Sequence, residues 1–214
     1  MASSDKAPLT TFWESVYERP QVPWDIAKAQ PELVDAIGRG DFLGPAVLDV
    51  GCGTGDNAIL LARSGFRVTA FDLVEKAVSI AKQRVADAGE MSGSLDVYQA
   101  NVFELDKTPF HNMKFDTVLD SAIFHCIGDD DAQKRYVDTI SKYVRKGGRF
   151  LMHVFSDQNP DPWVGPRRIS EAHVRTFFNE TTGWKVGIRP VCLRNSTPRA
   201  EGKSIFMVAE RTVD

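Results

Sequence analysis

Residues 47–55 read VLDVGCGTG, an apolar run that leads directly into three glycines at alternate positions. The apolar run predicts a buried strand, and residues 56–64 after it predict a helix. Glycines at such a junction allow a tight turn and let a ligand approach the backbone closely. The following helix begins with N–H groups that have no partner within the helix. The stretch therefore indicates a ligand-binding loop between a strand and a helix.

The spacing of these glycines excludes two common nucleotide-binding loops. The dinucleotide fingerprint G-x-G-x-x-G needs glycine where this chain has Asp56, and an acid there would repel a pyrophosphate. A P-loop is excluded because no Gly-Lys-Ser/Thr follows. Asp72 ends the next β-like run, where a carboxylate suits hydrogen bonding to ribose hydroxyls. Capping of the next helix is the alternative role of Asp72.

Short β-like runs alternate with helical stretches through the middle of the chain. We expect strands at residues 46–50, 67–71, 95–100, 115–119 and 149–155, and helices at residues 56–64, 74–86 and 130–144. Lys146-Gly147-Gly148 is expected to be a turn. A helix over residues 170–178 and a hairpin of runs 185–193 and 203–210 follow. This order predicts an α/β fold, a doubly wound, mostly parallel sheet with one antiparallel strand in the C-terminal hairpin.

The composition is that of an ordinary globular domain. The 214 residues carry a formal net charge of −3 and no basic stripe, so a nucleic-acid partner is not expected. No run approaches the roughly 20 apolar residues that span a bilayer, and the start MASSDKAPLT has no signal-peptide character. Three widely spaced cysteines without a CxxC indicate reduced thiols in a cytoplasmic protein. The oligomeric state cannot be deduced from these data.

Several segments together resemble the class I S-adenosylmethionine-dependent methyltransferases. Residues 49–55 and Asp72 resemble motifs I and II of the family, and residues 115–121 resemble motif IV. Asn101-Val102 resembles the segment that contacts the adenine. Residues 143–148 resemble the segment L-x-P-G-G, although Arg145-Lys146 replaces the proline pattern, which changes a turn and not the cofactor site. The resemblance covers residues 30–155 and implies a seven-stranded Rossmann-like sheet with an antiparallel last strand.

The resemblance implies S-adenosylmethionine as the cofactor. The residues that it assigns to cofactor binding are Trp24, Asp49, Gly51, Gly53, Gly55, Asp72, Leu73, Asn101, Val102, Asp120 and Ser121.

The N-terminal region resembles the active-site lid of small-molecule methyltransferases. Trp13, Tyr17 and the run Pro23-Trp24-Asp25 are similar to the start of thiopurine, halide/thiol and bacterial heterocyclic-toxin methyltransferases. Residues 120–125 and 165–170 look closest to the heterocyclic-toxin enzymes. We expect residues 1–30 to form a loose tail followed by a lid without a long helix, and residues 31–214 to form a single methyltransferase domain.

The function expected from this resemblance is methyl transfer to O, N or S of a small, aromatic or heterocyclic molecule. A thiol or halide methyltransferase and a non-catalytic cofactor-binding module are alternatives. A nicotinamide oxidoreductase is a third alternative, and the misplaced third glycine argues against it.

The acceptor site is assigned from residue chemistry and position. His125 follows the fourth strand and is the candidate general base, with packing beside the cofactor or helix capping as the alternative. The other substrate candidates are Trp13, Tyr17, Trp163, Arg167 and Arg168. Core packing is the alternative for Trp13, and a solvent-exposed pair at a helix start is the alternative for the two arginines. His153 is expected to be a packed structural residue. Asp129-Asp130-Asp131 precedes a helix and is expected to cap it, so no metal is predicted.

Overall fold

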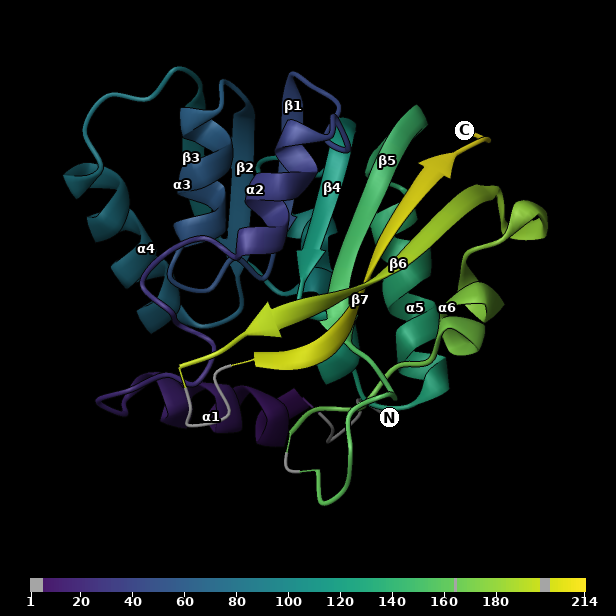
Figure 1. Ribbon diagram of the computed structural model, residues 1–214. Coiled ribbons are helices and arrows are strands. Elements are labelled where there is room, and N and C mark those ends of the chain that lie inside the picture. The colour runs from purple at the N-terminus through teal and green to yellow at the C-terminus, as the bar shows by residue number, and fades with distance from the viewer. Residues whose placement is uncertain (1–5, 164, 197–200) are drawn as a thin grey trace.

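The computed structural model describes residues 6–163, 165–196 and 201–214. Its centre is a seven-stranded sheet with the order β3-β2-β1-β4-β5-β7-β6 (Figure 1). The strands are β1 (Ala46–Val50), β2 (Arg67–Asp72), β3 (Ser94–Gln99), β4 (Phe115–Ser121), β5 (Val144–Phe155), β6 (Trp184–Arg194) and β7 (Glu201–Arg211). β1 to β5 pair in parallel, and β7 lies antiparallel between β5 and β6. The predicted α/β fold with one antiparallel strand is confirmed.

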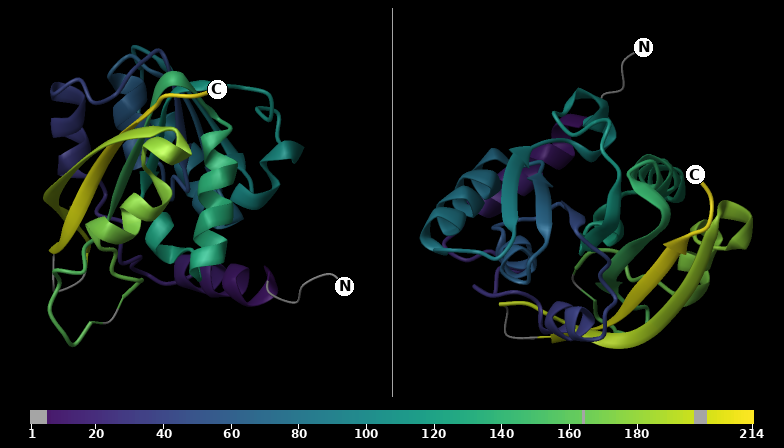
Figure 2. Two further views of the ribbon diagram at one scale, coloured as in Figure 1. Left: turned by 90° about the vertical axis from the view of Figure 1, so that its right-hand side faces the viewer. Right: turned by 90° about the horizontal axis from the view of Figure 1, so that it is seen from above.

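Helices cover both faces of the sheet (Figure 2). α2 (Pro31–Gly38), α3 (Asp56–Arg63) and α4 (Glu75–Asp87) contribute to one apolar cluster, together with the sheet residues Val47, Leu119 and Leu151. α5 (Asp130–Ser141) and α6 (Glu171–Phe177) contribute to a second cluster with Val118 and Phe150. β1 and β4 are buried along almost their whole length because both of their faces are covered, which explains their continuous apolar runs.

The expected turn at Lys146-Gly147-Gly148 is wrong. α5 ends at Ser141 rather than near Val144, and β5 begins at Val144, which pairs with Phe115. The register between β4 and β5 then shifts, and Gly147 has a φ of +72°. The glycines therefore form an irregularity inside a long strand rather than a turn before it.

The N-terminal segment contains a helix from residue 6 onward, where a loose tail was expected, and residues 1–5 of that expected tail lie outside the described residues. α1 (Lys6–Tyr17) lies across the edge where the parallel strands end (Figures 1 and 2). Trp13, Val16 and Tyr17 have the i, i+3, i+4 spacing of one helix face. Val16 and Tyr17 are buried in a small cluster with Val74. Helical spacing over less than two turns was too short a signal to identify α1 from the sequence.

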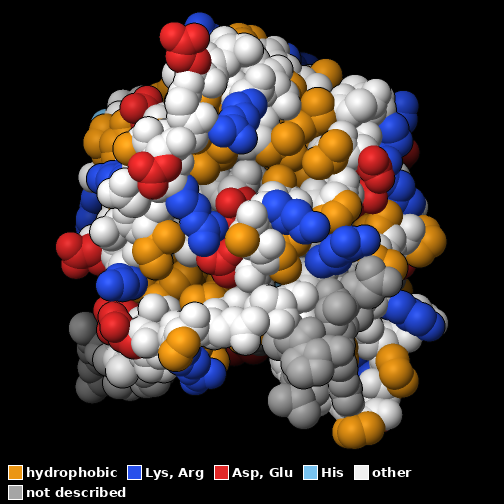
Figure 3. All heavy atoms as spheres, turned by 60° about the vertical axis from the view of Figure 1, so that its left-hand side comes forward, with side chains coloured by type: hydrophobic (Ala, Val, Ile, Leu, Met, Phe, Trp, Pro, Cys, Tyr) orange, Lys and Arg blue, Asp and Glu red, His pale blue; other side chains and the backbone are white. Residues whose placement is uncertain are grey.

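The surface charge is mixed. On the face shown in Figure 3, Lys and Arg side chains lie among Asp and Glu side chains. Within the described parts of the chain, no helix has both the length and the apolar character needed to span a membrane.

Candidate active site

The glycine loop adopts a backbone that side chains rarely tolerate. Gly53 has a φ of +56°, and a Cβ atom built on it would lie 3.3 Å from the Tyr17 hydroxyl. Gly55 has a φ of +88° immediately before α3, and its Cβ would lie 3.0 Å from the Cβ of Ala81 on α4. The loop therefore needs glycine at three positions: at Gly53 for contact with α1, at Gly55 for close packing of α3 against α4, and at Gly51, where φ is +63° and a Cβ would clash with Ile123 Cδ1. Gly51, the remaining glycine of the loop, lies against Ile123 from the loop after β4.

Asp72 ends β2 directly beside this loop. Its Oδ2 accepts a hydrogen bond from the Gly53 N–H (2.9 Å), and its Oδ1 accepts one from the Val74 N–H (2.9 Å). Burial raises the pKa of Asp72, and these backbone hydrogen bonds oppose the rise. Each carboxylate oxygen has a second lone pair, so ribose hydroxyls can still donate to it. Asp72 thus braces the glycine loop through Gly53 and the chain after β2 through Val74, and its oxygens keep capacity for a further donor.

Asp49 is a buried acid with one oxygen unused. Its Oδ2 has no hydrogen-bond partner among the described residues, and its residue exposure is 1%. Burial, and then the charges of Asp120 and Asp72, raise its pKa to about 7. A cation beside these carboxylates would relieve both the burial cost and their mutual repulsion. The arrangement fits S-adenosylmethionine, which carries a sulfonium and an ammonium group.

Three further cofactor candidates flank this pair of acids. Asn101 caps the 3-10 helix Val102–Lys107, because its Oδ1 accepts a hydrogen bond from the Phe103 N–H. Leu73 and Val102 are half-buried next to the ends of β2 and β3. The structure places all three along the edge that holds Asp49 and Asp72.

Asp120 differs from Asp49 because its acceptor capacity is used by the chain itself. It accepts hydrogen bonds from Ile123 N (2.8 Å), Phe124 N (3.0 Å) and the Tyr136 hydroxyl (2.6 Å). Burial raises its pKa to about 6. Its geometry does not support direct cofactor contact and indicates that it shapes the loop carrying Ile123. Ser121 pairs with His153 across β4 and β5.

His125 does not have the geometry of a general base. Its Nδ1 accepts a hydrogen bond from the Phe155 N–H (3.1 Å), and its ring stacks on Phe155 at 5.2 Å with 7° between the planes. The neutral ring therefore carries its proton on Nε2 and has no free lone pair. Burial, followed by the nearby His153, lowers its pKa to about 3. The packing alternative is the one that this geometry supports.

His153 has the structural role expected for it. It is fully buried within β5, and its Nε2 lies 2.9 Å from the Ser204 hydroxyl.

The loop after β5 extends the aromatic stack of His125 and Phe155. Trp163 packs edge-on against Phe155 at 5.1 Å, and its Nε1 donates to the Pro166 carbonyl. Arg167 pairs with Asp130 at 2.6 Å, and Arg168 pairs with Asp161 at 3.0 Å. Both arginines are engaged within the chain, so their ion pairs favour the alternative to binding an acidic substrate.

Aromatic residues of the N-terminal segment form one cluster that reaches the glycine loop through the Tyr17 hydroxyl. Trp24 makes edge contacts with Trp13 (5.3 Å) and Tyr17 (5.7 Å), and its Nε1 donates to the Tyr17 hydroxyl. Burial, and then the charge of Asp72, raise the pKa of Tyr17, so this phenol stays protonated. The three side chains considered for cofactor or substrate contact are therefore brought together, next to Gly53.

Comparison with known proteins gives concordant results. Residues 47–148 match a family model described as a methyltransferase domain. The chain is 29% identical over 168 residues to the 2-heptyl-1-hydroxyquinolin-4(1H)-one methyltransferase of Mycobacteroides abscessus, covering 78% of this chain and 70% of that protein. It is 30% identical over 129 residues to an uncharacterised methyltransferase of Schizosaccharomyces pombe, covering 59% of this chain and 84% of that protein.

A solved structure is also similar over nearly the whole chain. It comes from work on the conversion of a disulfide bond into a thioacetal group during echinomycin biosynthesis. The TM-score is 0.79 at 28% identity, covering 96% of this chain and 93% of the other.

The sheet order, the glycine loop and the buried acids at its edge define a methyl-transfer enzyme with a Rossmann-like domain. The chain belongs to the class I S-adenosylmethionine-dependent methyltransferases. S-Adenosylmethionine is its cofactor.

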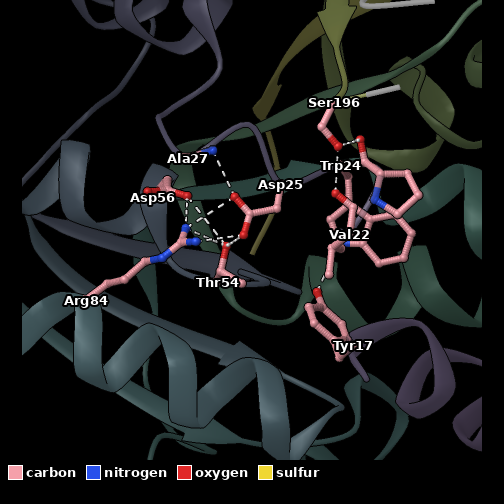
Figure 4. A network of polar contacts seen from close by, with 10 residues as sticks. Tyr17, Val22, Trp24, Asp25, Ala27, Thr54, Asp56, Arg84 and Ser196 are labelled. Atoms are coloured by element: carbon pink, nitrogen blue, oxygen red, sulfur yellow. Dashed lines mark hydrogen bonds and ion pairs between the residues drawn. The ribbon is translucent and has the colours of Figure 1, made fainter. Parts of the chain in front are cut away.

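Asp25 forms an ion pair that was not expected from the sequence. It lies in the run Pro23-Trp24-Asp25, where only the tryptophan was singled out, and it pairs with Arg84 of α4 (Figure 4). The available signal was an acid one residue after a candidate lid tryptophan, and nothing in the sequence identified its partner.

Proposed function

We propose that this methyltransferase acts on a planar aromatic or heterocyclic small molecule whose accepting O, N or S atom is already ionised when it binds. The observation that carries the proposal is the distribution of aromatic side chains at the cofactor edge. Trp13, Tyr17 and Trp24 lie on one side, above the glycine loop, and Trp163 lies on the loop after β5. Flat aromatic surfaces bind flat ligands with large contact area. The hydroxyquinolinone methyltransferase relative acts on a ligand of this shape.

The protonation state of the acceptor follows from the state of the candidate bases. S-Adenosylmethionine supplies the reactive methyl group and its own leaving group, so the protein has to position the acceptor and exclude water. The Nδ1 lone pair of His125 accepts a hydrogen bond from the Phe155 N–H, its Nε2 carries the proton of the neutral ring, and the oxygens of Asp120 accept from three donors. An acceptor that needed proton removal would find no base in either residue. An acceptor with a low pKa, such as an N-hydroxy group or a thiol, needs none.

The segment before α2 has the position of a lid in this proposal. The Tyr17 hydroxyl sits beside Gly53, and the Trp24 indole bonds to that hydroxyl. Residues 11–30 would order over the cofactor and keep water from the reacting atoms. We also propose a cytoplasmic location, which rests on Cys52, Cys126 and Cys192 being free thiols.

The test is turnover of an acceptor panel with saturating S-adenosylmethionine, followed by the mass of the methylated product. The panel contains hydroxyquinolones, phenols, aromatic thiols, amines and halides. We expect turnover of planar acceptors that are ionised at the assay pH. Turnover of halides or small aliphatic thiols alone would favour the thiol or halide alternative. Tight binding of S-adenosylhomocysteine without turnover of any acceptor would favour a non-catalytic binding module.

The variant Trp163→Ala separates acceptor binding from cofactor binding. It should raise KM for aromatic acceptors about 5-fold to 20-fold, a loss of one aromatic packing partner. Its affinity for S-adenosylhomocysteine should match that of wild type. Equal KM values in the two proteins would remove Trp163 from the acceptor site.

A further inference from the structure

We propose that Arg84, on α4, is a positioning residue that holds the lid against the glycine loop through an ion-pair network with Asp25 and Asp56. The inference rests on the lid assigned above and adds the contact that keeps it closed. Figure 4 shows the guanidinium of Arg84 pointing between Asp25, Thr54 and Asp56. These partners come from the lid, the glycine loop and the start of α3, which makes Arg84 the point where three segments meet.

The contacts of Arg84 are specific. Its Nη2 lies 2.7 Å from Asp25 Oδ2, and its Nη1 donates to Thr54 Oγ1 at 2.9 Å and pairs with Asp56. The Thr54 hydroxyl in turn donates to Asp25 Oδ2 at 3.1 Å. Thr54 stands between Gly53 and Gly55, so the network joins the lid to the same loop that holds the cofactor.

Asp25 also fixes the path of the lid backbone. Its Oδ1 accepts a hydrogen bond from the Ala27 N–H (2.9 Å), and Ala27 has a φ of +54°, which is uncommon for a residue with a side chain. Val22 and Pro23, just before Asp25 in the lid, are bonded to Ser196. The Ser196 Oγ donates to the Val22 carbonyl, and the Ser196 N–H donates to the Pro23 carbonyl. The lid is thus held on one side by the tip of the hairpin and on the other side by Arg84.

The charge balance makes Arg84 the critical member. The network contains two carboxylates and one guanidinium. Although burial opposes it, hydrogen bonding from Arg84 and Ala27 holds the pKa of Asp25 below its usual value. Burial, together with the charge of Asp25 and against that of Arg84, raises the pKa of Asp56. Without the guanidinium, Asp25 of the lid would face Asp56 at the start of α3 with no cation between them, and attraction would become repulsion.

Three variants test this electrostatic explanation. Arg84→Gln removes the charge, Arg84→Lys keeps it without the fork of donors, and Arg84→Gln/Asp56→Asn removes the charge together with one of the two acids. The control is Arg39→Gln, at a second partly exposed arginine that pairs with two acids: Arg39 pairs with Glu32 and Asp41 at 40% side-chain exposure against 30% for Arg84, and Arg189 also pairs with both acids. Arg39 follows α2 and is bonded to neither the lid nor the glycine loop in these contacts.

The readouts are hydrogen exchange of residues 13–27 in the free protein and the dissociation rate of S-adenosylhomocysteine, followed by tryptophan fluorescence. Melting temperature is recorded for every variant. We expect Arg84→Gln to increase both rates about 3-fold to 10-fold, the scale of a partly exposed ion-pair network. Both rates of Arg84→Lys should lie between those of wild type and those of Arg84→Gln. The double variant should reverse at least half of the increase seen in Arg84→Gln. Arg39→Gln should lower the melting temperature at most and leave both rates unchanged.

Two outcomes would overturn the proposal. One is the same lid exchange in Arg84→Gln as in Arg39→Gln, and the other is a double variant no slower than Arg84→Gln. A failure of the lid itself is distinguishable from either outcome. In that case wild-type residues 11–30 would gain no protection from S-adenosylhomocysteine.

Discussion

The two halves of the carboxyl edge of the sheet use their polar groups differently. In the half formed by β1 and β2, Asp49 keeps an oxygen without a partner among the described residues, and the loop bonds of Asp72 leave lone pairs for a ligand. In the half formed by β4 and β5, Asp120 and His125 use their hydrogen-bond acceptors for backbone N–H groups of the chain itself. The first half can therefore bind through hydrogen bonds and charge beside the cluster of Trp13, Tyr17 and Trp24, whereas the second half offers the aromatic surface of Trp163 without free polar groups on Asp120 or His125. Cofactor recognition and acceptor recognition should respond to different kinds of substitution.

The largest effect should come from the glycine loop. Gly53→Val places a branched side chain at a φ of +56°, next to the Tyr17 hydroxyl. We expect a loss of more than 100-fold in affinity for S-adenosylhomocysteine, about 3 kcal/mol or more, measured by calorimetry. Gly40→Val is the control, because Gly40 has a φ of +72° with open space around its Cβ position. If both variants bind equally well, the loop is not the cofactor site.

A smaller loss should follow removal of the acid at the end of β2. Asp72→Ala leaves the Gly53 and Val74 N–H groups without their acceptors and removes the expected partner of the ribose hydroxyls. The expected cost is about 1–3 kcal/mol of cofactor binding. Calorimetry on the folded variant measures it. An unchanged dissociation constant would leave Asp72 with the capping role alone.

The unpaired acid of β1 should give an effect on stability that depends on pH. The pKa of Asp49 is raised to about 7 by burial and by Asp120 and Asp72. For a raised pKa, the stabilising contribution of the protonated form is complete below about pH 4 and is lost as the pH rises through about 7. Asp49→Asn should therefore match the free wild-type protein at low pH and exceed it by about 2 kcal/mol at pH 8. Urea unfolding at both pH values provides the measurement, and a gain that is equal at both would contradict the buried charge.

In the β4–β5 half, His125 should behave as a packing residue. His125→Asn keeps an acceptor near the position of Nδ1 for the Phe155 N–H, whereas His125→Ala removes it. We expect the Asn variant to lose less than about 10-fold in kcat, and the loss to be equal for acceptors of graded pKa. A true base would cost about 10²–10⁴-fold in both variants, with a loss that shrinks for ionised acceptors. The pH–rate profiles decide between the two roles.

The smallest effect is expected at the exposed arginines. Arg167→Gln breaks an ion pair with Asp130, whose side chain is 67% exposed. The change should cost less than about 1 kcal/mol of unfolding free energy and leave KM for neutral acceptors unchanged. A rise in KM confined to anionic acceptors would show that Arg167 turns from Asp130 to the substrate.

The sequence predicted the first half of this edge better than the second for a physical reason. The glycine loop, Asp72 and the strand boundaries of β1 and β2 depend on local backbone requirements, which a short motif records. The roles of His125 and Arg84 depend on partners about 30 or more residues away, Phe155 for one and Asp25 for the other. Lys146-Gly147-Gly148 has the composition of a turn, and pairing of Val144 with Phe115 overrode it.

The position of β7 between β5 and β6 bears on how the enzyme is made. β6 pairs in the sheet with β7, which comes later in the chain, so β6 cannot join the sheet until β7 has been synthesised. Ser196, which binds the Pro23 carbonyl, lies in the connection between these two strands. The β1–β4 pairing can thus form during synthesis before the lid gains its anchor at Ser196. Premature termination would then yield a partly formed sheet with an unanchored lid.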